Sequence, residues 1–245
     1  MKQKLFITLI LCVWIPMAYA AGIPHLLPWP QQVDWNRQTF SEKEIALQAE
    51  GNTEQIVTAW LQENNISINP ASKYKLQVKL VKELPEAKLN ANEAYKLQVS
   101  SQGIIIEATT EQGVYWAIQT LRQLTEKKGD RAYITGCRIT DWPAFRIRGF
   151  MQDVGRSYIS LEELKREIAI LSRYKINVFH WHLTENQSWR LESKVFPMIN
   201  DSINTTRMPG KYYTQEEAKE LVEFCKQHQV MLIPELDMPD RKSVV

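Results

Sequence analysis

Residues 177–190 read "NVFHWHLTENQSWR". The first half of this stretch is short and largely apolar, which is typical of a strand buried on both faces. Its second half turns polar from Glu185 onward. His180 and His182 stand one residue apart, so on a strand their side chains point to the same face. The stretch therefore predicts a buried strand that ends in polar side chains.

Two similar stretches lie on either side of it, and a helix is expected in each gap. Ser160 and Glu163 form a capping box at the start of the first helix, as Thr214 and Glu217 do for the second. The expected apolar stripes are Leu161, Leu164, Ile168 and Leu171 in the first helix, and Ala218, Leu221, Val222 and Cys225 in the second. Strands separated by capped helices are typical of parallel βαβ units, so we expect an α/β fold here.

Each of the three expected strands ends in polar residues. They are Asp153 and Arg156 in "RIRGFMQDVGR" (146–156), Glu185 and Asn186 in the stretch above, and Glu235 and Asp237 in "VMLIPELDM" (230–238). The carboxyl ends of parallel strands meet at one edge, which is where such proteins bind their ligands. The pattern therefore predicts a binding site made by all three strand ends.

The preceding residues show a mixed pattern. The expected elements are a helix at 54–62 that buries Ile56, Ala59 and Trp60, strands at 74–81, 95–99 and 104–108, and a hairpin turn at 100–103. Thr109 and Gln112 predict a capping box for a second helix. These elements predict a small α+β domain at residues 21–141 with helices on one face of its sheet, followed by the α/β domain at 142–239.

Residues 1–20 are expected to be a signal peptide. Lys2 and Lys4 precede an apolar run, and Ala-Tyr-Ala at 18–20 is typical of a cleavage site. The run is short for a transmembrane helix and Pro16 interrupts it. We therefore expect export to the periplasm or the cell exterior, with no membrane association after cleavage.

Composition excludes some classes of protein. The 245 residues carry a formal net charge of +2, which argues against a disordered tail or a basic nucleic-acid-binding arm, so we expect no nucleic-acid partner. Beyond the signal peptide only Cys137 and Cys225 are present, too few for a disulfide scaffold. Cys225 is expected to be a core residue; whether the two cysteines pair is open, as is the oligomeric state.

Four stretches, taken in order, resemble the β-N-acetylhexosaminidases of glycoside hydrolase family 20. They are "RGFMQDVGRSY" (148–158), "INVFHWHLTENQSWRLE" (176–192), "GKYYTQEEAKELV" (210–222) and "VMLIPELDMP" (230–239), while residues 24–124 resemble the domain before the barrel in that family. The resemblance implies a (β/α)8 barrel that removes terminal β-linked N-acetylglucosamine or N-acetylgalactosamine with retention. It also implies that the acetamido oxygen of the substrate is the nucleophile, without a metal or cofactor.

Site residues follow from the resemblance by position. Arg156 matches an arginine that binds sugar hydroxyls, and Glu185 matches a carboxylate that pairs with a histidine near the catalytic acid; both are expected to bind the substrate. Asp153 is expected to orient Arg156. His182, Trp189 and Asp237 are expected to support the site. Trp181 and Trp189 are also candidate stacking surfaces for a sugar ring, with packing inside the barrel as the alternative for Trp181.

The resemblance also implies that part of the barrel is missing. A (β/α)8 barrel takes about 250 residues, whereas three strands are expected here. The catalytic aspartate–glutamate pair of the family is expected beyond the end of this chain, so no catalytic residue is assigned. Residues 240–245, "DRKSVV", stand where relatives continue with Gly-His, and we expect a non-native tail. The chain is thus expected to be an inactive N-terminal part of an enzyme whose partner is an oligosaccharide or glycoconjugate ending in N-acetylhexosamine.

Two alternatives stay open. A protein that binds amino sugars without cleaving them would need only the contacts of Arg156 and Glu185. A zinc-dependent barrel hydrolase would use His180 and His182. The chain has four histidines, however, and a catalytic zinc takes about three protein ligands. We therefore expect both histidines to be hydrogen-bonded residues of the barrel interior.

Overall fold

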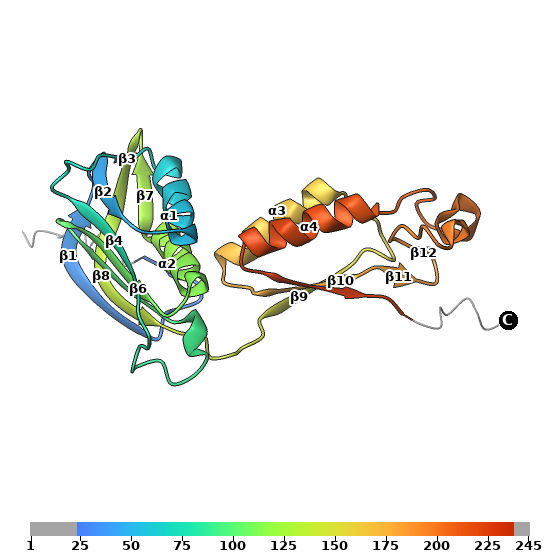
Figure 1. Ribbon diagram of the computed structural model, residues 1–245, viewed down its shortest axis with the longest axis horizontal. Helices are drawn as coiled ribbons and strands as arrows, with labels where there is room; N and C mark the ends of the chain where they lie inside the picture. The colour runs from blue at the N-terminus through green and yellow to red at the C-terminus, as the bar shows by residue number, and fades with distance from the viewer. Residues whose placement is uncertain (1–23, 238–245) are drawn as a thin grey trace, which may run out of the picture.

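The computed structural model describes residues 24–237, which form a small sheet domain followed by a helix-covered parallel sheet (Figure 1). The expected signal peptide at 1–20 and the expected non-native tail at 240–245 lie outside the described residues. No helix among the described residues has the length and apolar character that crossing a membrane requires.

The small domain is built on an eight-stranded mixed sheet with strand order β1-β8-β5-β6-β4-β2-β3, in which β7 also pairs with β8. Its strands are β1 (Gln32–Phe40), β2 (Glu44–Gln48), β3 (Ser67–Ile68), β4 (Lys75–Leu80), β5 (Tyr95–Ser100), β6 (Gly103–Ala108), β7 (Thr125–Lys128) and β8 (Arg131–Asp141). Its helices are α1 (Asn52–Glu63), α2 (Glu111–Leu124) and the short η1 (Ala91–Glu93). In Figure 1, α1 and α2 cover the same face of the sheet, which confirms the expected α+β architecture.

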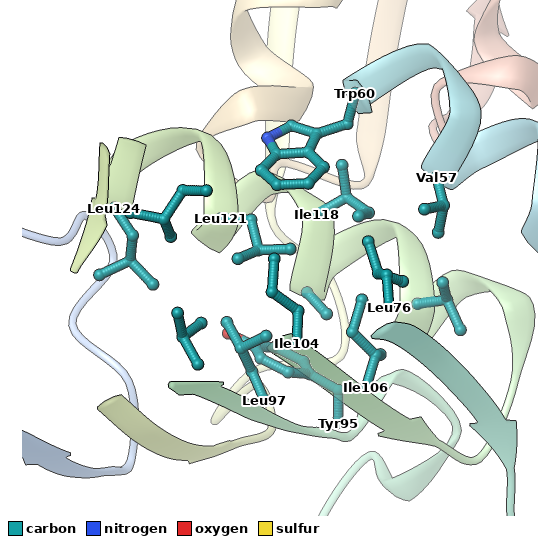
Figure 2. Packing of buried hydrophobic residues seen from close by; sticks show 14 of the residues in the cluster. Val57, Trp60, Leu76, Tyr95, Leu97, Ile104, Ile106, Ile118, Leu121 and Leu124 are labelled. Carbon is teal, nitrogen blue, oxygen red and sulfur yellow. The ribbon is translucent and has the colours of Figure 1, made fainter. Parts of the chain in front are cut away.

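The core of this domain lies between that face and the two helices. Figure 2 shows Trp60 of α1 and Ile118 of α2 directed toward Ile104 and Leu97 on the sheet, and all four are buried. The expected hairpin joins β5 to β6, and Gly103 at its turn has a φ of +148°. A Cβ at this position would lie 2.2 Å from the carbonyl oxygen of the neighbouring strand β4, so only glycine fits.

Two local predictions for this domain were wrong in detail. Helix α2 is capped by Thr110 rather than Thr109: the Thr110 hydroxyl accepts the Gly113 N–H at 3.3 Å, and the two threonine hydroxyls donate to the carbonyl oxygens of Asn92 and Ala91. Helix α1 buries Val57, whereas Ala59, which was expected to be buried, is exposed. The packed face of the helix is rotated from the predicted stripe. Both differences arise from tertiary contacts that the local pattern does not contain.

The second domain is a three-stranded parallel sheet in the order β13-β10-β9. Its elements are β9 (Gly149–Asp153), α3 (Leu161–Arg173), β10 (Val178–His182), β11 (Thr184–Glu185), β12 (Ser188–Trp189), η2 (Pro197–Asn200), η3 (Ser202–Asn204), α4 (Gln215–Gln227) and β13 (Met231–Glu235). Helices α3 and α4 pack side by side on one face of the sheet (Figure 1). The alternation of parallel strands and helices is that of an incomplete (β/α)8 barrel, as predicted.

Both predicted capping boxes are present, at Ser160 before α3 and Thr214 before α4. The predicted stripes are largely buried, with two differences. Ser172 is buried more deeply than Leu171, and Val222 is 37% exposed. Leu171 and Val222 lie at the margin of the buried face of their helices, where the period of 3.6 residues directs a side chain only partly toward the sheet.

Two buried ion pairs join the domains at the turns that connect their elements. The Nζ of Lys175 donates to Asp141 at 2.8 Å and to the Tyr95 hydroxyl at 2.9 Å. Arg148 donates to Glu93 at 2.5 Å, and Glu93 also accepts from the indole N–H of Trp116. We call this group the domain junction. It lies toward the amino ends of the parallel strands.

Cys137 and Cys225 do not pair with each other. Cys137 lies in the core of the small domain and Cys225 in that of the second domain, and both are free and buried. Burial raises the pKa of each thiol to about 12, so neither forms a thiolate near neutral pH. The expected role of Cys225 as a core residue is confirmed.

Candidate functional site

The carboxyl ends of the three parallel strands meet at one edge, as predicted. In the strand register His182 lies beside Asp153 on one side and Glu235 on the other. We call the residues at and just beyond these strand ends the rim. Figure 1 shows the small hairpin of β11 and β12 at the end of the sheet farthest from the small domain.

Arg156 holds two carboxylates of the rim together. Its Nη2 lies 2.8 Å and its Nε 3.3 Å from Glu185 Oε1, and the Nε lies 3.2 Å from Asp153 Oδ2. The pKa of Arg156 is raised by the hydrogen bond and charge of Glu185, and further by the charge of Asp153. The arginine side chain is 60% exposed whereas that of Glu185 is 7% exposed. The guanidinium is therefore fixed by its neighbours and still open to a ligand.

The turn that carries Arg156 passes tightly against the neighbouring strand end. The backbone N–H groups of Val154 and Gly155 both donate to the carbonyl oxygen of His182, at 3.0 and 3.2 Å. A Cβ on Gly155 would lie 2.9 Å from the carbonyl carbon of Thr184. The backbone N–H of Arg156 then donates to Asp153 at 3.0 Å. These contacts fix where the arginine side chain begins.

Both histidines of the opening stretch contact carboxylates on the same face of β10. His182 is buried, with Nε2 at 3.2 Å from Asp237 and Nδ1 at 3.6 Å from Asp153. His180 Nε2 lies 2.5 Å from Glu235. The backbone N–H of Asp237 donates to the hydroxyl of buried Thr184 at 2.8 Å. The contacts of both histidines with carboxylates agree with the expected hydrogen bonding, and their place in a barrel interior stays a prediction.

The two tryptophans have different surroundings. Trp181 is 2% exposed and its ring lies 4.8 Å from that of Tyr213 in the core under the helices. Of the two alternatives for Trp181, the structure supports packing and not a stacking surface for sugar, because odd and even residues of β10 point to opposite faces and Trp181 lies in the core. Trp189 lies on β12 opposite Thr184 and is half-buried. It stays a candidate contact for a ligand at the rim.

One group of rim side chains has the geometry of a cation site within the described residues. His182, Glu235 and Asp237 each offer a ligand atom, and these atoms lie within 4.8 Å of one another. His180 is not a member of this group, although its Nε2 contacts Glu235. The alternative of a zinc site made by His180 and His182 therefore does not match this group, which contains one histidine and two carboxylates.

Sequence reasoning assigned no role to Arg190, which follows Trp189 in the opening stretch. Its side chain is fully buried, and it donates to backbone carbonyl groups on both sides of it. The position of this arginine, directly after a strand-like segment, was the available sign in the sequence that it has a structural role. Its partners lie up to 36 residues away and could not be identified from the local pattern.

Comparison with known proteins agrees with this architecture. Residues 23–142 match the model "Glycosyl hydrolase family 20, domain 2", and residues 145–243 match "Glycosyl hydrolase family 20, catalytic domain". The two models of one family thus cover nearly all the described residues.

Curated relatives and solved structures give the same result. The chain is 36% identical over 160 residues to the β-hexosaminidases of Porphyromonas gingivalis and Vibrio furnissii. These alignments cover 60% of this chain and 20% and 26% of the relatives, so the chain spans only a fraction of their length.

Two solved structures resemble the chain closely. The family 20 exo-β-N-acetylglucosaminidase of Vibrio harveyi, solved with N-acetylglucosamine, has a TM-score of 0.73 and 32% identity, covering 87% of this chain and 36% of that one. The N-acetyl-β-hexosaminidase of Streptomyces plicatus has a TM-score of 0.74 and 26% identity, covering 87% and 46%. The fold and both family models agree, and the chain belongs to glycosyl hydrolase family 20, of which it contains domain 2 and the first strands of the catalytic domain.

Proposed function

We propose that this chain supplies the sugar-holding part of a β-N-acetylhexosaminidase. The observation that carries the proposal is the exposed Arg156 guanidinium, fixed by Glu185 and Asp153 at the strand ends of a family 20 catalytic domain. The ligand is the terminal N-acetylglucosamine or N-acetylgalactosamine of an oligosaccharide or glycoconjugate. The protein named in the Vibrio harveyi structure binds N-acetylglucosamine, which supports this class of ligand.

Arg156 is suited to neighbouring hydroxyl groups. Its planar guanidinium presents donors in a rigid fork, so it can bind two vicinal oxygens at once. Glu185 Oε1 already accepts from Nη2 and Nε, which orients the fork. Asp153 contributes a second anchor and does not act on the substrate. Arg156 thus binds the sugar, and both carboxylates position it.

The remaining rim residues hold this arrangement in place. His182 bridges Asp153 and Asp237, so that three strand ends act as one unit. Trp189 is positioned to bound the site on the side of the β11–β12 hairpin, where an indole face can pack against a sugar ring. We assign His182 and Asp237 supporting roles and Trp189 a binding role.

Hydrolysis itself requires groups that this chain does not supply. In substrate-assisted hydrolysis the acetamido oxygen attacks the anomeric carbon while a carboxylic acid protonates the leaving oxygen. The family's adjacent aspartate–glutamate pair does not occur in the 245 residues. We propose that the chain binds the sugar without cleaving it, and release of nitrophenol from nitrophenyl N-acetylglucosaminide by the purified chain would contradict this.

Titration with N-acetylglucosamine, followed by nuclear magnetic resonance, tests the binding site. We expect shifts confined to the rim, and affinity at least about tenfold weaker in Arg156→Met, since hydrogen bonds to a charged group contribute about 1.5–3 kcal/mol. Arg207→Met, which removes an exposed arginine elsewhere in this domain, is the matched control and should bind like the unmodified chain. Equal affinity in both variants would refute the assignment of Arg156.

A divalent-cation site is the second candidate, favoured by the grouping of His182, Glu235 and Asp237. One imidazole and two carboxylates suit zinc. Calorimetric titration with zinc should then show one site that His182→Gln abolishes. Absence of saturable binding to the unmodified chain rejects this candidate and leaves the sugar site untouched.

We also propose that the protein is exported to the periplasm or cell exterior, on the pattern of residues 1–20. Mass spectrometry of the protein secreted by a bacterial host should show an N-terminus at Ala21. Retention of Met1 in the mature protein would overturn this.

A further inference from the structure

Arg190 is a buried cation surrounded by backbone oxygens. Its side chain has no exposure to solvent. Among the described residues no carboxylate pairs with it, and its guanidinium donates only to main-chain carbonyl groups. Burial lowers the pKa of Arg190 from the ordinary arginine value. Because that ordinary value is far above neutral pH, the side chain stays charged. Such a charge is retained only where several dipoles replace its water shell.

The carbonyl groups come from two separate loops. On one side, Nε donates to Val154 at 3.0 Å and Nη2 to Gly155 at 3.4 Å. On the other side lie the carbonyl oxygens of residues 207–211, namely Arg207 at 2.8 Å, Met208 at 3.2 Å and Lys211 at 2.7 Å. One guanidinium therefore ties the turn after β9 to the loop before α4.

The first of these loops is the one that carries Arg156. Residues 154 and 155 immediately precede it, and their N–H groups bind the carbonyl oxygen of His182. Their carbonyl groups point the other way: that of Val154 accepts from Arg190, and that of Gly155 accepts from both Arg190 and the hydroxyl of Ser188. The N–H groups of Val154 and Gly155 are thus satisfied by backbone, whereas their carbonyl groups depend on side chains, and Arg190 is the one that binds both of them.

From this geometry we infer that Arg190 is a positioning residue: it fixes the Val154–Gly155 turn, and through it the Arg156 guanidinium against Glu185. Lysine cannot replace it, because an ammonium has three donors at one point and the carbonyls of the two loops lie on opposite sides of a planar fork. The consequence for sugar affinity rests on the proposed function, whereas the effect on the turn does not.

Two signals in the full chain test the inference without any sugar. The first is the Nε–H resonance of Arg156, which the Glu185 contact displaces from that of free arginine. The second is the exchange rate of the Gly155 amide. In Arg190→Met we expect the resonance to move toward the free position and the amide to exchange about fivefold faster or more, equivalent to a hydrogen bond of about 1 kcal/mol. The Nε–H of Arg148, bound to the Lys175 carbonyl oxygen at the domain junction, should not change and reports an intact fold.

Arg207→Met is the control, because it removes a cationic side chain from the same loop and keeps the carbonyl group that Arg190 binds. Unchanged Arg156 and Gly155 signals in Arg190→Met, or equal changes in the control, would overturn the inference. If Arg190→Met loses its fold, Arg190→Lys decides, since it keeps the charge: weakened turn signals support the fork, and signals like those of the unmodified chain reject it. N-acetylglucosamine binding by the unmodified chain is a separate measurement whose failure rejects the sugar site alone.

Discussion

Replacing Lys175 with methionine removes the cation at the centre of the domain junction. Lys175 and Asp141 are 6% and 7% exposed, and their side chains meet at 2.8 Å. Burial lowers the pKa of Lys175 although the Asp141 charge raises it, so the lysine depends on this carboxylate. Methionine fills a similar volume, and the substitution leaves Asp141 as a buried charge without its cation.

The expected loss of stability depends on the hydrogen bonds that Asp141 keeps in the variant. Breaking a buried ion pair by removing one partner costs about 3–5 kcal/mol. Asp141 still accepts from the Tyr95 hydroxyl at 3.1 Å and from the Gln31 N–H at 3.2 Å. These two neutral donors partly stabilise the carboxylate, so we expect the free energy of unfolding to fall by about 3 kcal/mol, the lower end of the range. The double variant with Asp141→Asn removes the stranded charge and should recover about 2 kcal/mol.

Urea denaturation measures the free energy of unfolding of the four proteins of this double-mutant cycle. Lys43→Met is the control, because Lys43 and Asp130 also form a close pair, but on the surface. We expect its unfolding midpoint to match that of the unmodified chain, since exposed pairs contribute little. A loss below about 1 kcal/mol in Lys175→Met, or additive losses in the cycle, would show that the junction is not held by this pair.

Three further changes test other parts of the structure. The hydrogen bonds from Ser160 lower the pKa of the Glu163 carboxyl below 4.5. The capping box is therefore complete above pH 4.5, and its stabilisation is lost as the pH falls through the lowered pKa. The carbon resonances of Glu163 should titrate at that lowered pKa, and a midpoint of 4.5 or above contradicts the cap. Gly155→Ala should displace the rim turn, because the added methyl meets backbone of β11; unchanged amide resonances around residue 155 would refute the close packing. Trp181→Ala should destabilise the fold by about 3–5 kcal/mol, because Trp181 is a core residue. Trp189→Ala should lower N-acetylglucosamine affinity with a smaller loss of stability. A larger loss of stability in Trp189→Ala by thermal denaturation, with weaker sugar binding in Trp181→Ala by titration, would exchange their roles.

The parts that could be predicted are those whose causes lie close together in the sequence. Ser160 and Thr214 cap their helices through residues three positions away, so the pattern contains both partners. The rim could be predicted because parallel strands bring their carboxyl ends to one edge whatever lies between them. Arg156 and Glu185 meet for that reason although 29 residues separate them.

The parts that could not be predicted depend on partners chosen by packing. Lys175 sits in a turn with a φ of 62° and reads as an exposed loop lysine, yet its partners are 34 and 80 residues away. Arg190 binds carbonyl groups, which every residue has and no sequence pattern distinguishes. Thr110 rather than Thr109 caps α2, beside η1, whose carbonyl groups accept from both hydroxyls and are absent from the local pattern.

The order of the strands has a consequence for synthesis on the ribosome. In the second domain the spatial order β9, β10, β13 is also the order of translation, so each strand joins a free edge and none must insert between earlier ones. The small domain precedes them with its sheet complete, and nascent domains generally fold in that order. Glu93 and Asp141 are therefore in place when Arg148 and Lys175 emerge, and the first domain serves as a template on which the next begins to assemble.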